Sequence, residues 1–483
     1  MTSFRRWSLT ALLAAAVAAG PASELAAQQP LRMVGPTAFT VWQYNATTQC
    51  GAGNDYPDVP ARPFLVGDLA NPTVLWFAGN SNGNYASIGT GGVDILATLQ
   101  RGSLAGPPKC LPWSTPPTYA NSTPQSYSTG LWMVAPFTPD GINVQALVHN
   151  EFHGEWVGNN SFCSPPKGVP PIYLPCNYWN MVSASSTDGG QTFQVAKQPG
   201  NPGFNSPAIA LGAPYQDPTQ GTQPNPNFLG PQGMAAQSNI LQFGSYYYVL
   251  AQQLPYSATG PYSPQGGVCI YRAPVPASPG GALVWTGWGG STYDVPVPTT
   301  YPDPTNNPTL CNAVLGSQFR FSWSISRSLQ GFVPVVILIG QDTQAGMARS
   351  GVALDNCPYA PEVTSGSTDG AFVYALATLD PNTGTLTQFW HETCLLQTNS
   401  IAKWQSGTTF TGQAYPSLLD PASPGLGAGD RNFQYSGIGP YLYFTQLNAR
   451  TGTGPFNNRN LVRMPMEASW GNPQESTSGA SKP

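Results

Sequence analysis

Short β-type runs, each followed by a turn and a second β-type run, recur along this chain and leave few folds open to it. The segments "GLWMVAPFTPDGINVQALVHNEF" and "YWNMVSASSTDGGQTFQVA" turn at Pro-Asp-Gly and Asp-Gly-Gly. "NILQFGSYYYVLAQQ" turns at Gly244 and Ser245, and "AFVYALATLDPNTGTLTQFW" turns at Asp-Pro-Asn-Thr-Gly. No long window has apolar residues at helical spacing without a Gly or Pro break. The sequence therefore predicts an all-β protein.

Several such hairpins joined by long Pro-rich loops fit a β-sandwich, a β-helix or a β-propeller. The propeller is favoured because its blades are four-stranded meanders of this spacing. We expect a single β-propeller domain over residues 28–470 with five blades, and six blades as the alternative. Residues 471–483 are polar and lack apolar periodicity, which predicts a disordered tail.

Charged residues make up only 8% of the chain, whereas an average globular protein has ~25%. The 53 glycines and 51 prolines alone would suggest disorder, but 13 Trp, 22 Tyr and 20 Phe argue for a buried core. The net charge is −4 and no basic cluster is present. This balance excludes nucleic-acid binding, which needs a basic surface.

The first 27 residues have the order of a secretory signal peptide. Arg5 and Arg6 precede the apolar run "WSLTALLAAAVAAG", and small residues follow it; the arginine pair also leaves a twin-arginine signal open. No later run approaches the ~18 apolar residues that a membrane helix needs. We expect a secreted or periplasmic monomer without membrane attachment after signal cleavage.

Eight cysteines in an exported chain without a CxxC spacing are expected to form disulfides. Cys163 and Cys176 bracket the loop "SPPKGVPPIYLP" and are the first pair expected. Eight cysteines allow 105 connectivities. The order along the chain suggests three further pairs: Cys50 with Cys110, Cys269 with Cys311, and Cys357 with Cys394.

One hairpin turn, "SSTDGGQTF", matches the Asp-box pattern Ser-x-Asp-x-Gly-x-Thr-aromatic. Asp188 can accept backbone and hydroxyl hydrogen bonds across the turn, and Gly190 can take a positive φ. Phe193 is expected to pack beneath the turn. The motif therefore predicts a locked hairpin.

Five segments of the chain together resemble a known group of proteins: "DVPARPF", "ALVHNEFHG", "STDGGQTF", "QSNILQFGSYYYVL" and "YPSLLDP…DRNFQYSGIGPYLYFTQLN". On these segments the chain resembles secreted bacterial Asp-box propeller proteins, which are similar to sialidases and five-bladed glycoside hydrolases. These segments span most of residues 50 to 465. The resemblance implies a central pocket lined by the innermost strand of each blade. It also implies that an aspartate of the first blade and a later glutamate flank a sugar, and the matching residues are Asp58 and Glu151.

Sialidases bind a carboxylated sugar with three arginines and attack it with a tyrosine. Resemblance to them implies these roles for Arg62, Arg320, Arg431 and Tyr435. The chain departs from their Arg-Ile-Pro-like motif, because Pro63 and Phe64 follow Arg62.

The stretch "ALVHNEFHGEW" gathers two of the three histidines of the chain and two glutamates. A strand from Ile142 to Phe152 places His149, Glu151 and, one residue further, His153 on one face. Burying such a polar group without partners is costly, which suggests a pocket. Glu151 is then a candidate general acid or base, supported by an imidazole, with Trp156 at the pocket edge. The alternative is an exposed or internally hydrogen-bonded strand end.

The same His-x-Glu-x-His pattern allows a divalent metal with His149, Glu151, His153 and His391 as ligands. Same-face neighbours on a strand are about 6.6 Å apart, which strains three ligands from one strand. We therefore expect no metal and no cofactor, and keep a metal-dependent carbohydrate-active enzyme as an alternative.

Three other residues are candidate sugar contacts. Arg62 is expected beside Asp58, where it would keep the carboxylate ionised, or in a simple salt bridge of the first blade. Arg431 would grip a hydroxyl or carboxylate, or stabilise a turn. Asn239 opens a strand. These features predict a glycoside hydrolase acting on oligo- or polysaccharide through Asp58 and Glu151, or alternatively a non-catalytic propeller that binds glycan or protein.

Overall fold

The residues that the computed structural model describes fall into separate ranges along the chain. They are 31–35, 37–42, 57–70, 72–75, 77–79, 85–88, 108–111, 126–128, 130–153, 177–210, 232–235, 237–254, 267–297, 310–314, 324–328, 335–349, 357–363, 368–380, 386–389, 393–406, 411–427, 429–449 and 458–468. The expected signal peptide and C-terminal tail lie outside them.

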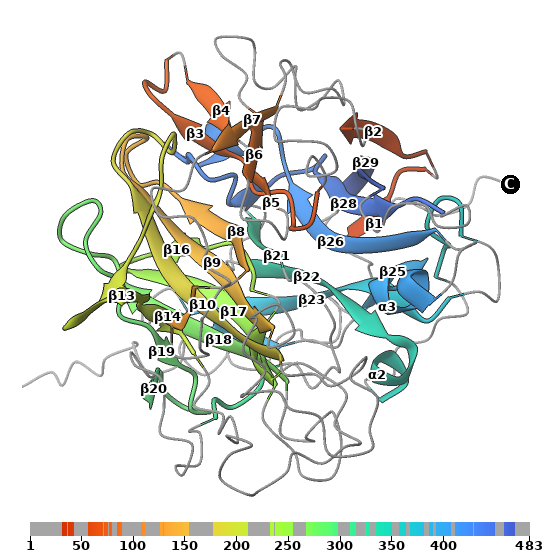
Figure 1. Cartoon of the computed structure of the whole chain (residues 1–483). Helices are drawn as coiled ribbons and strands as arrows, with labels where there is room; N and C mark the ends of the chain where they lie inside the picture. The colour runs from red at the N-terminus through yellow and green to blue at the C-terminus, as the bar shows by residue number, and fades with distance from the viewer. Residues whose placement is uncertain are drawn as a thin grey trace, which may run out of the picture.

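The described strands form the sheets of a β-propeller, which confirms the predicted fold class (Figure 1). We divide them into five blades, although strand pairing joins blades 2 and 3 into one 11-stranded sheet and blade 1 consists of a 2-stranded and a 3-stranded sheet. Blade 1 contains β3 (Phe64–Val66), β4 (Thr73–Leu75), β5 (Phe77–Gly79), β6 (Tyr85–Ile88) and β7 (Pro108–Leu111). Blade 2 contains β8 (Leu131–Phe137), β9 (Val144–His153), β10 (Asn177–Ser186), β11 (Gln194–Val195) and β14 (Pro207–Ile209). Blade 3 contains β15 (Gln232–Ala235), β16 (Leu241–Phe243), β17 (Tyr246–Leu254), β18 (Gly267–Pro274), β19 (Thr286–Gly287) and β20 (Val295–Pro296).

The last two blades follow the same meander. Blade 4 contains β21 (Ser324–Ser328), β22 (Val335–Thr343), β23 (Gly370–Leu379), β24 (Leu386–Phe389) and β25 (Thr393–Thr398), and β27 (Tyr435–Ser436) joins β21 in parallel. Blade 5 contains β26 (Gly412–Leu419), β28 (Tyr441–Leu447) and β29 (Arg459–Ala468). A small hairpin of β12 (Lys197–Gln198) and β13 (Asn201–Asn205) lies apart, and the described helices are short: α2 (Gln344–Arg349), α3 (Ile401–Ser406) and α4 (Ser423–Leu426).

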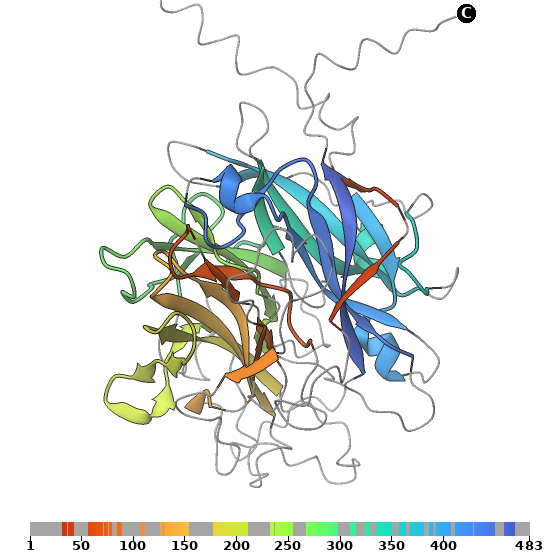
Figure 2. The ribbon, with the colours of Figure 1, turned by 90° about the horizontal axis from the view of Figure 1, so that it is seen from above.

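The two ends of the chain close the ring in blade 5. The strands β1 (Leu31–Met33) and β2 (Phe39–Trp42) both pair antiparallel with β29. Figure 2 shows these early strands lying along the late blade. Pairing an N-terminal strand with the last blade holds the first and last blades together. The segment before β3 therefore lies against blade 5, and this segment contains Asp58.

Apolar side chains fill the space between neighbouring blades. One cluster joins blades 1, 2 and 3, a second joins blades 3 and 4, and a third joins blades 4 and 5. The strand β17 contributes to two of them, because Tyr247 packs in the first and Tyr248 in the second, each at most 1% exposed. A strand covered on both faces in this way explains the nearly continuous apolar run in its sequence.

These two tyrosines make stability sensitive to alkaline pH. Burial raises the pKa of Tyr247 and Tyr248 to about 12, from an ordinary value of 10.0. Between pH 10 and 12 the folded protein therefore keeps protons that the unfolded chain has lost, and stability falls as pH rises. We expect a loss of about 2–3 kcal/mol per tyrosine across this window. Urea unfolding at pH 9 and at pH 11 measures this loss of free energy of unfolding. The loss between the two pH values should be smaller for Tyr247→Phe than for the wild type, and equal losses in the two proteins would contradict the prediction.

The turn from Ser186 to Phe193 has the hydrogen bonds that its sequence predicts. Asp188 accepts hydrogen bonds from the backbone N–H groups of Gln191 and Thr192 at 3.0 Å each, and from the Thr192 hydroxyl at 2.6 Å. Gly190 has a φ of +80°, and Phe193 is buried. The side chain of Asp188 thus bonds the N–H groups of the turn between β10 and β11 and holds the turn closed.

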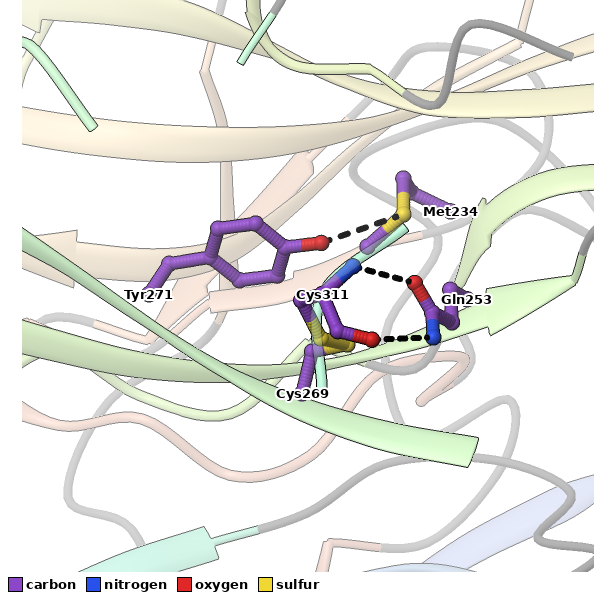
Figure 3. The surroundings of a disulfide bond; sticks show 5 residues. All are labelled: Met234, Gln253, Cys269, Tyr271 and Cys311. Atoms are coloured by element: carbon purple, nitrogen blue, oxygen red, sulfur yellow. Dashed lines mark hydrogen bonds between the residues drawn. A yellow bond between two sulfur atoms is a disulfide. The ribbon is translucent and has the colours of Figure 1, made fainter. Parts of the chain in front are cut away.

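Two of the expected disulfides are present. Cys269 on β18 bonds Cys311, with Cα atoms 6.1 Å apart, and Cys357 bonds Cys394 on β25, with Cα atoms 5.8 Å apart. Figure 3 shows that Gln253 donates to the carbonyl of Cys311 and accepts from its N–H. Together they fasten the segment of Cys311 to blade 3.

The disulfides indicate an oxidising environment outside the cytoplasm. No helix among the described residues is long and apolar enough to cross a membrane. The expected pair of Cys163 and Cys176 lies outside the described residues, as does Cys50.

Candidate active site

His149 and Glu151 share one face of β9, as strand periodicity predicts. Nε2 of His149 lies 2.8 Å from Oε1 of Glu151, and the two side chains are 12% and 17% exposed. The neighbouring strands place an indole beside each residue: Trp132 on β8 is paired with His149, and Trp179 on β10 is paired with Glu151. The imidazole is therefore held between two tryptophans, with ring centroids 5.8 Å away for Trp132 and 5.4 Å away for Trp179.

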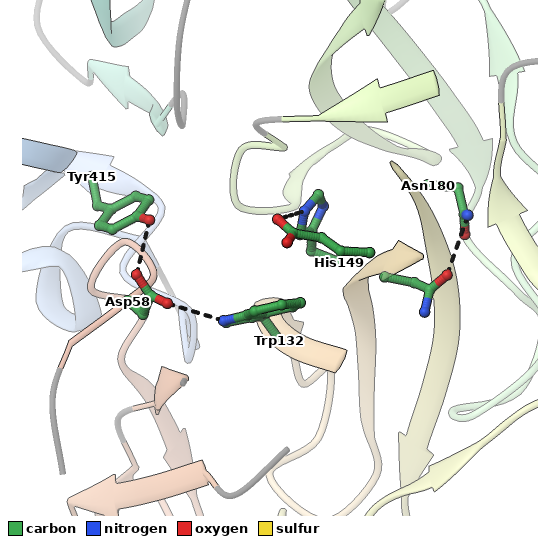
Figure 4. A network of polar contacts seen from close by, with 7 residues as sticks. Asp58, Trp132, His149, Asn180 and Tyr415 are labelled. Carbon is green, nitrogen blue, oxygen red and sulfur yellow. Dashed lines mark hydrogen bonds and ion pairs between the residues drawn. The ribbon is translucent and has the colours of Figure 1, made fainter. Parts of the chain in front are cut away.

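The opposite face of β9 is not wholly apolar. Asn150 lies there between Val148 and Phe152 and is completely buried. Its partner is Asn180 on β10, whose Nδ2 donates to Oδ1 of Asn150 at 3.3 Å (Figure 4). A buried amide needs such a partner to offset its lost hydration. The two faces of β9 are thus distinct, with the titratable pair on one face.

Gly130 lets Trp132 take its position. Its φ is +47°, and an added Cβ would lie 2.6 Å from the Trp132 ring and 3.0 Å from the carbonyl oxygen of Glu151. The N–H of Glu151 donates to the carbonyl of Gly130 at 2.9 Å. Only a residue without a side chain allows this close packing of indole and β9 backbone.

Asp58 receives hydrogen bonds from three parts of the ring. Trp132 Nε1–H donates to Oδ2 at 3.2 Å, and the Tyr415 hydroxyl donates to Oδ1 at 3.0 Å (Figure 4). Arg459 on β29 forms an ion pair with the same Oδ1. An opposite charge and two further donors favour the ionised form of the carboxylate. Its side chain is 13% exposed, so it is not fully enclosed by these partners.

Tyr415 reaches Asp58 from an irregular point in β26. The pairing of β26 with β28 shifts register between Ala414 and Ser417, and Tyr415 has a φ of +58°. Such a backbone conformation is uncommon for a bulky residue and persists only where the surroundings hold it. Here the bulge turns the tyrosine toward Asp58, as Figure 4 shows.

Trp132 therefore links the two candidate carboxylates. Its Nε1–H is bonded to Asp58, and its ring lies against the imidazole that is bonded to Glu151. Sequence reasoning selected Asp58, Glu151 and His149 but missed Trp132, Tyr415 and Arg459. Trp132 is paired with His149 by the register of the β8–β9 hairpin. The Pro-Asp-Gly turn of this hairpin, which is visible in the sequence, could therefore have indicated that Trp132 lies beside His149. The other two come from the far end of the chain, 357 and 401 residues from Asp58.

Arg62 is buried, with 4% of its surface exposed. Its Nη1 donates to the hydroxyl of Ser417 on β26 at 2.6 Å and to the carbonyl of Ala61 at 3.2 Å. Burial lowers the pKa of its guanidinium to about 9. The ion pair to Asp58 that the structure describes comes from Arg459.

Arg431 and Asn239 contact the protein backbone. Arg431 Nη1 donates to the carbonyl of Gly67 at 2.8 Å, in the turn after β3. Asn239 donates to the carbonyl of Ile325 and accepts from its N–H, both at 2.8 Å, which ties blade 3 to β21 of blade 4. Tyr435 is hydrogen-bonded to Arg327 at 2.8 Å. In these contacts the residues fasten neighbouring parts of the ring to one another.

Several candidates cannot be placed. Trp156, Arg320 and His391 lie outside the described residues, and only the backbone of His153 is described. Within the described part of the chain, no three His, Cys, Asp or Glu side chains gather as a metal site would require.

No family model matches this chain, and no curated protein matches its sequence. Solved propeller-like structures show distant similarity. A member of the GH130 family, said to contain glycoside hydrolases that target β-1,2 mannosidic linkages in Candida mannan, is 11% identical over 89% of this chain and 96% of that one, with a TM-score of 0.36.

Two further structures are similarly distant. An N-acetylgalactosamine deacetylase from F. plautii, in complex with blood group B trisaccharide, is 11% identical over 91% of this chain and 96% of that one, with a TM-score of 0.34. A β-fructofuranosidase from Aspergillus kawachii, complexed with glycerol, is 12% identical over 89% of this chain and 60% of that one, with a TM-score of 0.34.

Proposed function

We propose that this protein is a secreted glycoside hydrolase that uses Asp58 and Glu151 on oligo- or polysaccharide. The observation that carries the proposal is the pair of carboxylates joined through Trp132, each in a different environment. Asp58 has three donors, one of them cationic, whereas Glu151 has the imidazole of His149 and lies opposite Trp179. Acid and base catalysis by two carboxyl groups requires one carboxylic acid and one carboxylate, and different environments are the means by which proteins separate the two roles.

In this mechanism Glu151 is the general acid. Its Oε1 accepts from Nε2–H of His149, and its other oxygen gives a proton to the glycosidic oxygen as the bond to the anomeric carbon breaks. Asp58 is the ionised partner, which attacks the anomeric carbon or takes a proton from the attacking water. A carboxylate has about four acceptor positions, and three on Asp58 are used, so one is left for this role.

A glycan-binding propeller without catalysis is the second candidate, and the same contacts of Asp58 favour it. A carboxylate that holds an arginine, a tyrosine and a tryptophan together also serves to fix three parts of the ring. In that case Glu151 and His149 would bind sugar hydroxyls, and no bond would be broken.

The test is a hydrolysis screen of the mature protein against aryl glycosides and plant, algal and host polysaccharides, beside Glu151→Gln. We expect turnover by the wild type and a loss of roughly 10²–10⁴-fold in kcat in the variant, the usual contribution of a general acid. Glu467→Gln is the matched control, because Glu467 is an exposed glutamate of β29 paired with Arg32. Equal activity of Glu151→Gln and wild type would refute the role of Glu151; binding without turnover would favour the second candidate.

A further inference from the structure

Tyr415 has a backbone conformation that its own side chain and the next residue both oppose. Its φ of +58° lies in the left-handed region, which glycine adopts freely and a bulky residue rarely does. Pro416 follows, and the residue before a proline prefers an extended backbone. Glycine would suit this backbone better, so the contribution of the tyrosine has to come from its side chain. Strained residues of this kind gather at functional sites.

The parts of β26 on either side of Tyr415 are anchored. Ala414 is completely buried and is paired with Thr445 of β28. Pairing resumes at Ser417, which is also completely buried and whose hydroxyl accepts from Nη1 of Arg62 at 2.6 Å. Between these two anchors β26 has one residue more than β28, which is the pattern of a β-bulge. A bulge re-aims a side chain, and here it directs the tyrosine toward Asp58 (Figure 4).

The two oxygens of Asp58 have unequal sets of donors. The Tyr415 hydroxyl donates to Oδ1 at 3.0 Å, and the guanidinium of Arg459 contacts the same oxygen. Among the described residues Oδ2 has one donor, Nε1–H of Trp132 at 3.2 Å. A carboxylate oxygen has about two acceptor positions. Tyr415 and Arg459 therefore fill Oδ1, and the remaining acceptor position of the carboxylate belongs to Oδ2.

One buried indole supports both groups that hold Oδ1. Trp404 of α3 is completely buried, and its Nε1–H donates to the carbonyl of Asn448 at 2.9 Å. Tyr415 packs against the apolar cluster that contains Trp404, and the guanidinium of Arg459 lies over the indole at 5.6 Å. The two donors reach one oxygen from different strands, β26 and β29, and share this support. They therefore oppose rotation of the carboxylate about its Cβ–Cγ bond.

We propose that Tyr415 is a positioning residue for the reaction of Asp58. Resting on the proposed function, this assigns Oδ2 as the oxygen that attacks the anomeric carbon or takes a proton from the attacking water. The Tyr415 hydroxyl keeps Oδ1 bonded, which favours the ionised carboxylate and leaves Oδ2 to react. Holding a reacting group in one orientation lowers the barrier of the chemical step and has little effect on substrate binding.

Tyr415→Phe separates this role from packing, because phenylalanine keeps the ring beside Trp404 and removes only the hydroxyl. On a substrate found in the hydrolysis screen we expect kcat to fall about tenfold or more and KM to change less than about twofold. Activity on the acid side should be lost at a pH about one unit higher than in the wild type. Tyr441→Phe is the matched control, since Tyr441 is a partly buried tyrosine of the same sheet that lies beside Arg463 of β29. Its kcat and pH profile should equal those of the wild type.

A second readout does not depend on turnover. The Cγ signal of Asp58 is followed as the pH is lowered in protein labelled with ¹³C-aspartate, and Asp58→Asn assigns it. The midpoint of its titration should lie about one pH unit higher in Tyr415→Phe than in the wild type and in Tyr441→Phe. An unchanged midpoint, or a kcat equal to that of the wild type, would overturn the inference, while turnover by the wild type would leave the proposed hydrolase intact. If no substrate is turned over, the proposed function fails, and the midpoint alone decides whether Tyr415 holds Asp58.

Discussion

Arg459→Met should lower the free energy of unfolding by about 3–5 kcal/mol, the usual effect of removing one partner from a buried ion pair. Arg459 and Asp58 have side chains only 9% and 13% exposed, so water does little to replace the lost charge. Methionine keeps an apolar stem beside Trp404, over which the guanidinium of Arg459 lies at 5.6 Å. The substitution therefore removes the charge with little loss of packing. Urea unfolding of the mature protein measures the effect.

A matched control and a double-mutant cycle separate this ion pair from general effects of charge. Arg32→Met removes the other described ion pair that involves β29, between Arg32 and Glu467. Their side chains are 63% and 41% exposed, so the loss should be at most about 1 kcal/mol. Combining Arg459→Met with Asp58→Asn should restore part of the loss, with a coupling energy of up to about 3 kcal/mol. A coupling energy near zero would show that Asp58 and Arg459 do not depend on each other.

The arrangement around Asp58 connects closure of the ring to the candidate site. β29, which contains Arg459, is also the strand to which β1 and β2 are paired. Asp58 lies in the segment that enters blade 1, and Trp132 belongs to blade 2. The carboxylate therefore fixes the position of blades 1, 2 and 5 relative to one another, and its orientation depends on the seam between the first and last blades.

The blades could be predicted from the sequence because their hairpins are local. Turn residues between two β-type runs indicated β8–β9, β10–β11, β16–β17 and β23–β24. The face of β9 that contains His149 and Glu151 followed from the two-residue period of a strand. Each of these features depends on residues that are close along the chain.

The partners of the site residues depend on the ring as a whole and could not be predicted in this way. Nothing near Arg459 in the sequence indicates that it would meet Asp58, 401 residues away. Asn239 was a candidate because it opens a strand, and Arg431 because its guanidinium suits a sugar hydroxyl or carboxylate. The same side chains also suit backbone contacts between blades, and only the three-dimensional arrangement distinguishes the two uses.

Gly233→Ala should be the most disruptive single-methyl change in the described part of the chain, with a loss of about 3–5 kcal/mol in the free energy of unfolding. Gly233 has a φ of +105°, and an added Cβ would lie 1.9 Å from the carbonyl oxygen of Trp179. That distance is far inside van der Waals contact with backbone, so β10 and β15 must separate. The change would weaken the parallel pairing between blades 2 and 3 and move Trp179 away from His149.

Gly200→Ala is the matched control, because Gly200 has a φ of +77° and nothing within 4 Å of the added Cβ. It should lose only the roughly 1–2 kcal/mol that a left-handed backbone costs an alanine. The comparison is made by urea unfolding, with the midpoint expected to fall and the slope unchanged. The Trp179 indole N–H signal should shift in Gly233→Ala and not in Gly200→Ala. If both variants lose the same stability, the close approach of β15 to β10 is not rigid, and the position of Trp179 must depend on its contacts within blade 2 alone.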